Sequence, residues 1–169
     1  MLSELKAIPL FASLQDGELN ALASGLVVRT LSKHTIVINE GDVTDSLYVI
    51  LSGRVKVYLG DASGKELVLD IIGPGKYFGE MALDGGPRSA SVMTLERCRF
   101  AVISRSDFEG ILVKHPKVAL RVVQNLIRRT RGLNENVKSL ATLDVYGRVA
   151  RLLLDLATEK DGKTVILNT

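Results

Sequence analysis

The chain has 169 residues, of which 46% are hydrophobic and 24% charged, and its formal net charge at pH 7 is +3. This length supports one sizeable core with a small further element, and no run of 18 or more apolar residues predicts a membrane span. A single cysteine, Cys98, excludes an internal disulfide, and since no secretory signal opens the chain we expect a cytoplasmic protein without membrane contact.

The first hundred residues predict one helix followed by strands. Residues 14–24 place apolar side chains at helical spacing, which indicates a short helix. Short runs rich in strand-forming residues then alternate with turn residues, and no helical pattern lies between them, so we expect an antiparallel sandwich or barrel of the jelly-roll type. The expected strands are 26–31, 35–39, 47–53, 54–60, 66–72, 89–95 and 99–104.

After Ser104 the periodicity becomes helical. A short helix is expected over 106–113, and a long helix over 116–143 begins with Pro116 in its first turn, where proline is favoured. Apolar residues of the long helix follow a heptad pattern, which predicts a parallel homodimer through this helix. A helix packed on its own barrel is the alternative, and both remain open. The heptad residues are Val123, Leu126, Thr130, Leu133, Val137 and Leu140.

The last residues have too little chain beside them to bury their apolar side chains. Asp144 is placed to cap a helix over about 145–159, and the strand-like run that begins at Lys163 has no expected partner. We therefore expect three regions: residues 1–113 with the jelly roll, 114–143 with the long helix, and 144–169 as the start of a further domain.

Positive charge is concentrated in residues 114–151, which hold nine Lys and Arg residues against two acids. A basic segment beside a mildly acidic body is typical of proteins that meet a polyanion such as nucleic acid. A solvated helix face gives the same pattern, so charge alone leaves both interpretations open.

The residues that most enzymes and metal sites need are scarce. The glycines match neither the phosphate-loop nor the dinucleotide-binding spacing. His34 and His115 are the only histidines and lie in different element types, so a histidine-rich metal site is not expected. No Ser/His/Asp or Cys/His arrangement indicates a nucleophile. We expect neither an enzyme nor a bound metal.

Residues 79–92 (GEMALDGGPRSASV) gather groups that suit an anion attached to a sugar. Residues 80–83 are expected to form one helical turn whose free N–H groups face the anion. Arg88 offers a fork of donors for phosphate oxygens, and Ser89 adds a hydroxyl. The Glu80 carboxylate only accepts hydrogen bonds, so a sugar hydroxyl is its natural partner. A hairpin tip with an exposed Glu80–Arg88 pair is the alternative.

Three segments resemble one known family. Residues 41–59 (GDVTDSLYVILSGRVKVYL) and 64–92 (GKELVLDIIGPGKYFGEMALDGGPRSASV) resemble the cyclic nucleotide-binding domain. Residues 125–157 (NLIRRTRGLNENVKSLATLDVYGRVARLLLDLA) are similar to the dimerisation helix and hinge of the Crp/Fnr family of bacterial transcription regulators. The resemblance implies a mainly β fold with flanking helices, in which a double-stranded β-helix, or jelly roll, precedes a long dimerisation helix. It also implies that a C-terminal domain of the full-length protein binds DNA, and that the effector controls this binding allosterically.

The resemblance assigns roles to individual residues. Glu80 is expected to accept the ribose 2′-hydroxyl, and Arg88 and Ser89 to bind the cyclic phosphate. Leu133 and Asn134 occupy the positions where family members that respond to cyclic AMP carry a Thr-Ser pair against the purine. The other expected ligand-binding residues are Gly79, Met81, Ala82 and Ala90 around the phosphate, and Val57, Leu69 and Ile72 as an apolar wall under the base.

The effector follows from the same resemblance. Cyclic AMP is expected, with cyclic GMP and cyclic di-GMP as alternatives, and the departure at Leu133 and Asn134 leaves open a family member that responds to another effector or to none. A regulatory domain of a channel or kinase-like protein is a further alternative. The hinge and helix in residues 143–157 argue against it, because that class does not need them.

Overall fold

The computed structural model describes residues 2–61, 63–142, 144–155, 157–160 and 163–166. The chain divides into two compact units, with bounds Met1–Val122 and Val123–Thr169. In the described ranges no helix is both long enough and apolar enough to cross a membrane.

Three short helical elements precede the strands: α1 (Leu2–Lys6), η1 (Pro9–Phe11) and α2 (Asp16–Gly25). The predicted helix over 14–24 is confirmed as α2, and it begins where the Gln15 N–H donates to a carboxylate oxygen of Glu18 at 2.7 Å. This bond satisfies one donor that the first turn of a helix leaves without a partner. The sequence patterns did not predict α1 or η1.

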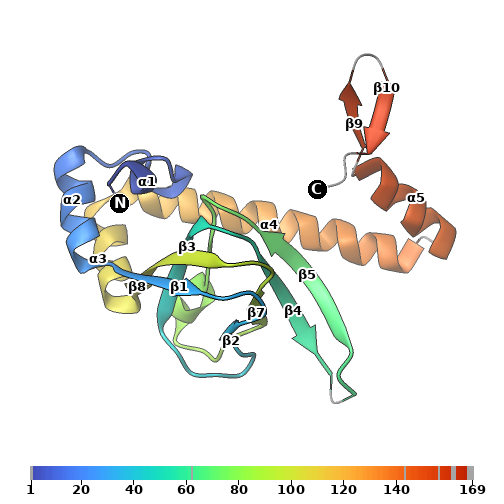
Figure 1. The fold of residues 1–169 in the computed structure, drawn as a ribbon, viewed down its shortest axis with the longest axis horizontal. Helices are drawn as coiled ribbons and strands as arrows, with labels where there is room; N and C mark the ends of the chain where they lie inside the picture. Colours follow the sequence, from blue (N-terminus) through green and yellow to red (C-terminus); the bar gives the residue numbers. More distant parts are fainter. Residues whose placement is uncertain (1, 62, 143, 156, 161–162, 167–169) are drawn as a thin grey trace. The chain divides into compact units, whose positions relative to one another are not determined.

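Two four-stranded antiparallel sheets form the body of the first unit, which confirms the predicted jelly roll (Figure 1). One sheet has the strand order β1-β8-β3-β6 and the other β2-β7-β4-β5. The two-residue strand Tyr77–Phe78 was not predicted, because two residues are too few to show alternation. The strands are β1 (Val27–Leu31), β2 (Ile36–Ile38), β3 (Ser46–Ser52), β4 (Val55–Gly60), β5 (Glu66–Ile72), β6 (Tyr77–Phe78), β7 (Ser91–Thr94) and β8 (Cys98–Ser104).

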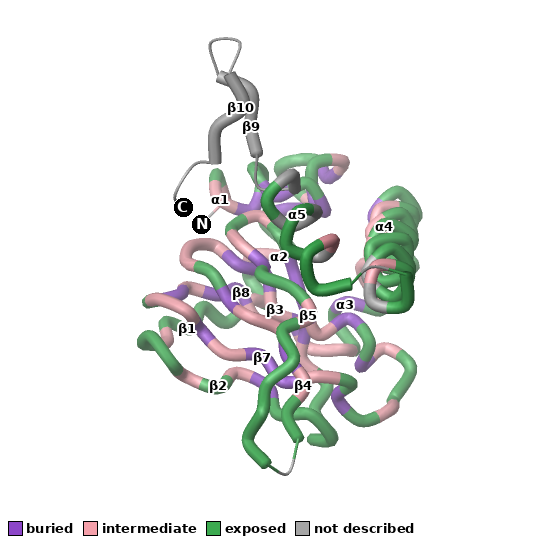
Figure 2. The backbone as a smooth tube through the Cα atoms, turned by 90° about the vertical axis from the view of Figure 1, so that its right-hand side faces the viewer, coloured by how far each residue is buried: buried purple, intermediate pink, exposed green. Residues whose placement is uncertain are grey.

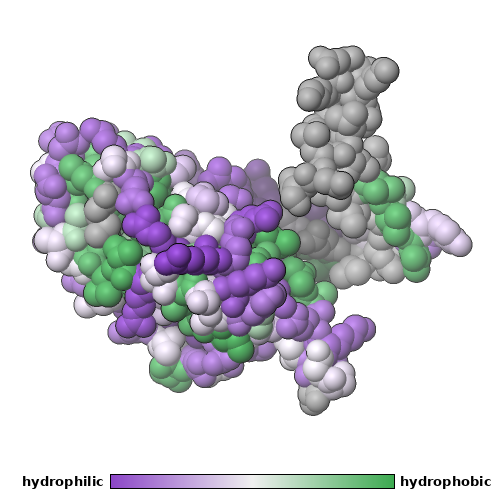
Figure 3. Space-filling view, viewed as in Figure 1, coloured by the Kyte–Doolittle hydropathy of each residue, from purple (hydrophilic) through white to green (hydrophobic). Residues whose placement is uncertain are grey.

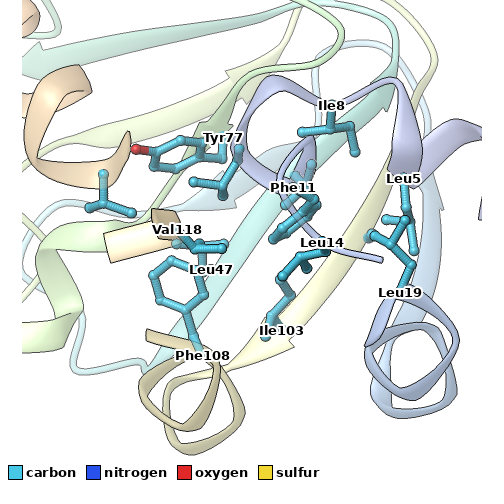
Figure 4. Packing of buried hydrophobic residues seen from close by; sticks show 14 residues of the cluster. Leu5, Ile8, Phe11, Leu14, Leu19, Leu47, Tyr77, Ile103, Phe108 and Val118 are labelled. Atoms are coloured by element: carbon cyan, nitrogen blue, oxygen red, sulfur yellow. The ribbon is translucent and has the colours of Figure 1, made fainter. Parts of the chain in front are cut away.

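Buried apolar side chains form two clusters. One joins the first sheet to the helices, and Figure 4 shows Phe11, Leu47, Phe108 and Val118 among its members. The other fills the space inside the barrel, where the Phe78 ring stacks on Tyr48 and meets Phe100 edge-on, with ring centres 5.1 and 5.7 Å apart. The two clusters hold β3 and β8 from both sides.

Burial differs strongly between strands. Figure 2 shows buried positions recurring along β8, whereas β5 is exposed over most of its length. β5 lies at the edge of its sheet, so only β4 pairs with it. The face drawn in Figure 3 carries both hydrophilic and hydrophobic side chains over this unit.

Helix α3 (Arg105–Lys114) follows β8, and Ser104 caps it by accepting a hydrogen bond from the Asp107 N–H at 3.1 Å. Helix α4 (Pro116–Thr142) begins within the first unit, where Val118 and Val122 are buried. Both predicted helices are thus confirmed, with α3 one residue longer at each end than expected.

The second unit holds the rest of α4, followed by α5 (Val145–Asp155), β9 (Ala157–Lys160) and β10 (Lys163–Ile166). The Asp144 carboxylate accepts from the Gly147 N–H at 2.8 Å, as expected of a cap.

Two expectations for the end of the chain are wrong. The helix ends at Asp155 instead of continuing to about 159, and β10 has an antiparallel partner in β9. Apolar residues at helical spacing continue as far as Leu156 in the sequence, whereas residues 157–160 pair as a strand. The Asp-Gly sequence at 161–162 is one that strongly favours hairpins.

Candidate ligand-binding site

The segment that carries the candidate ligands begins with a glycine in a left-handed conformation. Gly79 has φ 88°, and the 3₁₀ turn η2 (Glu80–Asp84) follows it and ends at Gly85 with φ 79°. The Ala82 N–H donates to the Gly79 carbonyl at 3.2 Å. The predicted helical turn over 80–83 is therefore confirmed, and glycine is the residue that adopts the required backbone without strain.

The Arg88 side chain is fixed by three acceptors from two segments of the chain, residues 44–46 and Gly79. Its Nε donates to the Thr44 hydroxyl at 2.7 Å, its Nη1 to the Gly79 carbonyl at 2.9 Å, and its Nη2 to the Ser46 carbonyl at 2.7 Å. These bonds use three of the five guanidinium N–H groups. The cation is thus held between the start of β3 and the start of η2.

The backbone around Arg88 is tied to the loop before β3. The Arg88 N–H donates to the Asp42 carbonyl at 2.9 Å, and the Arg88 carbonyl accepts from the Gly41 N–H at 2.8 Å. Three residues further along the chain, the Ser91 hydroxyl accepts from the Glu40 N–H at 3.0 Å. Residues 41–46 therefore fix both the backbone and the side chain of Arg88.

Arg88 and Glu80 are both charged and both only 5% exposed. The alternative of an exposed hairpin tip with a surface ion pair is therefore wrong. Burial lowers the pKa of Arg88, while nearby acidic groups that include Asp45 and Glu80 act in the opposite direction. Arginine nevertheless stays protonated in proteins. The site thus offers a permanent cation beside a buried carboxyl group, an arrangement that costs free energy unless both groups have partners.

The remaining residues around η2 differ in burial. Ala82 is buried and Ala90 half-buried, whereas the side chains of Met81 and Ser89 are exposed. The Ser89 hydroxyl donates to the Met81 sulfur at 3.1 Å. The structure therefore brings together Gly79, Glu80, Met81, Ala82, Arg88, Ser89 and Ala90 in one loop.

The three residues expected under the base occupy different environments. Ile72 is 2% exposed and belongs to the cluster inside the barrel. Val57 is half-buried and packs against the same cluster. Leu69 is half-buried at a register shift, since Val57 pairs with Asp70 and Tyr58 with Val68. Leu69 is the extra residue of this bulge.

Thr44 and Ser46 are site residues that the sequence patterns missed. Both accept hydrogen bonds from the Arg88 guanidinium, and nothing local in the sequence marks either position. Asp70, which pairs with Val57, is exposed on the edge strand β5.

Thr44 also lines a cleft of about 290 Å³ beside η2, together with Val43, Asp45, Ala82, Gly85, Gly86 and Arg105. Leu133 and Asn134 lie on α4 in the second unit, and both are exposed. Their expected contact with a purine stays a prediction. Among the described residues no group of three or more His, Cys, Asp or Glu side chains could hold a metal ion.

Comparison with known proteins identifies a family for most of the first unit. The family model described as the cyclic nucleotide-binding domain matches residues 28–115. The cAMP-activated global transcriptional regulator CRP of Salmonella typhimurium is 37% identical over 135 residues, which are 79% of this chain and 64% of the regulator. The chain thus spans a little under two thirds of that relative.

Two solved structures have similar folds. The catabolite activator protein of Thermus thermophilus superposes with a TM-score of 0.70 at 32% identity, covering 88% of this chain and 70% of that protein. The c-di-GMP responsive global regulator CLP of Xanthomonas campestris gives a TM-score of 0.75 at 27% identity, covering 86% and 73%. Two of these three proteins are regulators by name, and the third is an activator.

Proposed function

Since the chain belongs to the cyclic nucleotide-binding domain family, we propose that it is the effector-binding and dimerisation region of a Crp/Fnr-type bacterial transcription regulator. Its proposed effector is a cyclic nucleotide, with cyclic AMP preferred. The protein is cytoplasmic and has no enzymatic activity in this proposal. Control of DNA binding belongs to the full-length regulator.

The observation that carries the proposal is the buried guanidinium of Arg88. Its three hydrogen bonds to Thr44, Gly79 and Ser46 fix its position, so two of its five N–H groups remain for an anion. A bidentate arginine suits phosphate oxygens. Ser89, exposed one residue along the chain, adds a hydroxyl to the same phosphate in this proposal.

The sugar and the base have separate partners. The buried carboxylate of Glu80 accepts the ribose 2′-hydroxyl, because an acceptor-only group repels phosphate and suits a donor. Val57 and Leu69 contact the base, while Ile72 supports this wall from the core. Leu133 and Asn134 approach the purine from α4.

Allosteric control requires two states with different affinities for the ligand. In the proposed mechanism the nucleotide contacts both the pocket and α4, and so favours one arrangement of the DNA-binding domains over another. Exposed apolar side chains on α4, namely Val123, Leu126, Leu133 and Val137, form the homodimer contact. The side chain of Leu140 lies outside the described residues.

A second candidate is a Crp/Fnr-type regulator that responds to another effector or to none. Leu133 and Asn134 favour it, because they stand where the resemblance implies a Thr-Ser pair in members that respond to cyclic AMP. A regulatory domain of a channel or kinase-like protein is a weaker candidate, since it does not need α5 after the long helix.

Calorimetric titration with cyclic AMP, cyclic GMP and cyclic di-GMP separates the candidates. The proposal expects saturable binding that is tightest for cyclic AMP. Tightest binding of cyclic di-GMP, or binding of none of the three nucleotides, would favour the second candidate.

A further inference from the structure

Met81 is an exposed residue whose sulfur contacts Ser89, a residue proposed to bind the cyclic phosphate. Met81 is 56% exposed, although it follows the buried Glu80 in η2. The Ser89 hydroxyl donates to the Met81 sulfur at 3.1 Å, across eight residues of sequence. This contact joins the two ends of the phosphate-binding segment.

We propose that Met81 is a modification site, at which oxidation of the thioether by a peroxide lowers the affinity of the pocket for cyclic nucleotides. The inference rests on the proposed function, because Ser89 is assigned there to the cyclic phosphate. It adds an oxidant-sensitive control to the nucleotide-sensitive one.

The chemical step is a two-electron transfer of oxygen. A sulfur lone pair attacks one oxygen of the peroxide, the O–O bond breaks and an S–O bond forms. The thioether becomes a sulfoxide, and with hydrogen peroxide the displaced hydroxide takes up the proton and leaves as water. Methionine sulfoxide reductases reverse this oxidation, so the modification can act as a switch.

Exposure favours Met81 over the other described methionine. Met93 lies within β7 and is half-buried, with strands on both sides. Oxidant in solution therefore reaches the Met81 sulfur more readily.

The effect on binding follows from the single proton of the Ser89 hydroxyl. A thioether is a weak acceptor, so Ser89 can turn from Met81 to a phosphate oxygen at little cost. A sulfoxide oxygen is a much stronger acceptor and retains that proton. It also places partial negative charge beside the phosphate. We expect an affinity about tenfold weaker, which corresponds to about 1.4 kcal/mol.

The same geometry predicts protection of the sulfur by the ligand. A nucleotide bound to Arg88 and Ser89 covers the neighbouring Met81 side chain. Saturating cyclic AMP should therefore slow the oxidation of Met81 and leave that of Met93 unchanged. This readout does not depend on the affinity of the oxidised protein.

The test uses the nucleotide-free 169-residue protein before and after hydrogen peroxide, with oxidation of each methionine followed by peptide mass spectrometry. Cyclic AMP is titrated into both forms, and into Met81→Leu and Met93→Leu proteins treated in parallel. Wild type and Met93→Leu should lose about tenfold in affinity, whereas Met81→Leu should keep its own untreated value. Sulfoxide reductase should restore the wild type.

The test distinguishes a failure of this inference from a failure of the proposed function. Unchanged cyclic AMP affinity after complete oxidation of Met81, or an equal loss in Met81→Leu, would overturn this inference alone. Absence of cyclic AMP binding before oxidation would overturn the proposed effector and this inference together.

Discussion

Arg88 donates through Nη1 to the carbonyl oxygen of Gly79 at 2.9 Å, and a Cβ atom added to Gly79 would stand 2.9 Å from that same nitrogen. It would also stand 2.9 Å from the Ser46 carbonyl, which accepts from Nη2 of the same guanidinium. The position of the cation therefore depends on the absence of a side chain at residue 79.

Gly79→Ala should lower both stability and nucleotide affinity. Alanine at φ 88° is strained, at a cost of about 1 kcal/mol or more, and its Cβ displaces Arg88. Thermal unfolding and cyclic AMP titration measure the two effects. Gly64→Ala is the matched control, since Gly64 has φ 82° with nothing within 4 Å of its added Cβ. It should lose stability and retain affinity, and equal affinity in both variants would contradict this account.

Thr44→Val should weaken cyclic AMP binding by about tenfold, whereas Thr44→Ser should preserve it. The Thr44 hydroxyl accepts from Nε of Arg88 at 2.7 Å, and a hydrogen bond to a charged group contributes roughly 1.5–3 kcal/mol. Valine keeps the shape of threonine and removes the acceptor, so a loss of affinity reports on the orientation of Arg88. Wild-type affinity in Thr44→Val would mean that the carbonyl oxygens of Gly79 and Ser46 suffice to orient Arg88.

Glu80 should make the pocket distinguish ribose from deoxyribose. A hydrogen bond to a charged group contributes roughly 1.5–3 kcal/mol, so 2′-deoxy cyclic AMP, which lacks the hydroxyl, should bind about tenfold or more weakly than cyclic AMP. In Glu80→Ala the two nucleotides should bind equally, because the acceptor is gone. Competition titration measures both ratios. Equal binding by the wild type would remove this role from Glu80.

Sequence patterns predicted much of the fold because each strand or helix has a hydrophobic periodicity that can be read within a short stretch of sequence. Seven expected runs became strands, and residues 80–83 formed the expected turn. The burial of Arg88 was not predictable, because its acceptors Thr44 and Ser46 lie more than 40 residues earlier. The role of Ile72 in the core likewise depends on Val55, which faces it from the neighbouring strand.

Residues 157–160 show where local patterns fail. Their strand depends on pairing with β10, and the preceding apolar period masked the change of structure. The register of β5 is a second case, since Val68 pairs with Tyr58 only because a bulge at Leu69 shifts the register by one residue. Cross-strand register is a tertiary property that a single sequence does not carry.

The dimer should persist without ligand. Leu133 is 49% exposed on α4 and follows the heptad of Leu126, and burying a leucine contributes roughly 1.5–3 kcal/mol from each chain. Size-exclusion chromatography with light scattering on nucleotide-free protein should give a dimer, and Leu133→Asp a monomer. Val113→Asp, at an exposed position of α3, is the control. A monomeric wild type, or a dimeric Leu133→Asp, would contradict the predicted homodimer contact through α4.

The most direct test is calorimetric titration of cyclic AMP into the wild type, Arg88→Ala and Arg54→Ala. Arg54 pairs with Glu96 on the surface at 3.3 Å and stands outside the site. Wild type and Arg54→Ala should bind one nucleotide per chain, and folded Arg88→Ala should lose about 2–5 kcal/mol, or about 30-fold and more in affinity. Wild-type affinity in folded Arg88→Ala, or no saturable binding by the wild type, would contradict the assignment of this pocket.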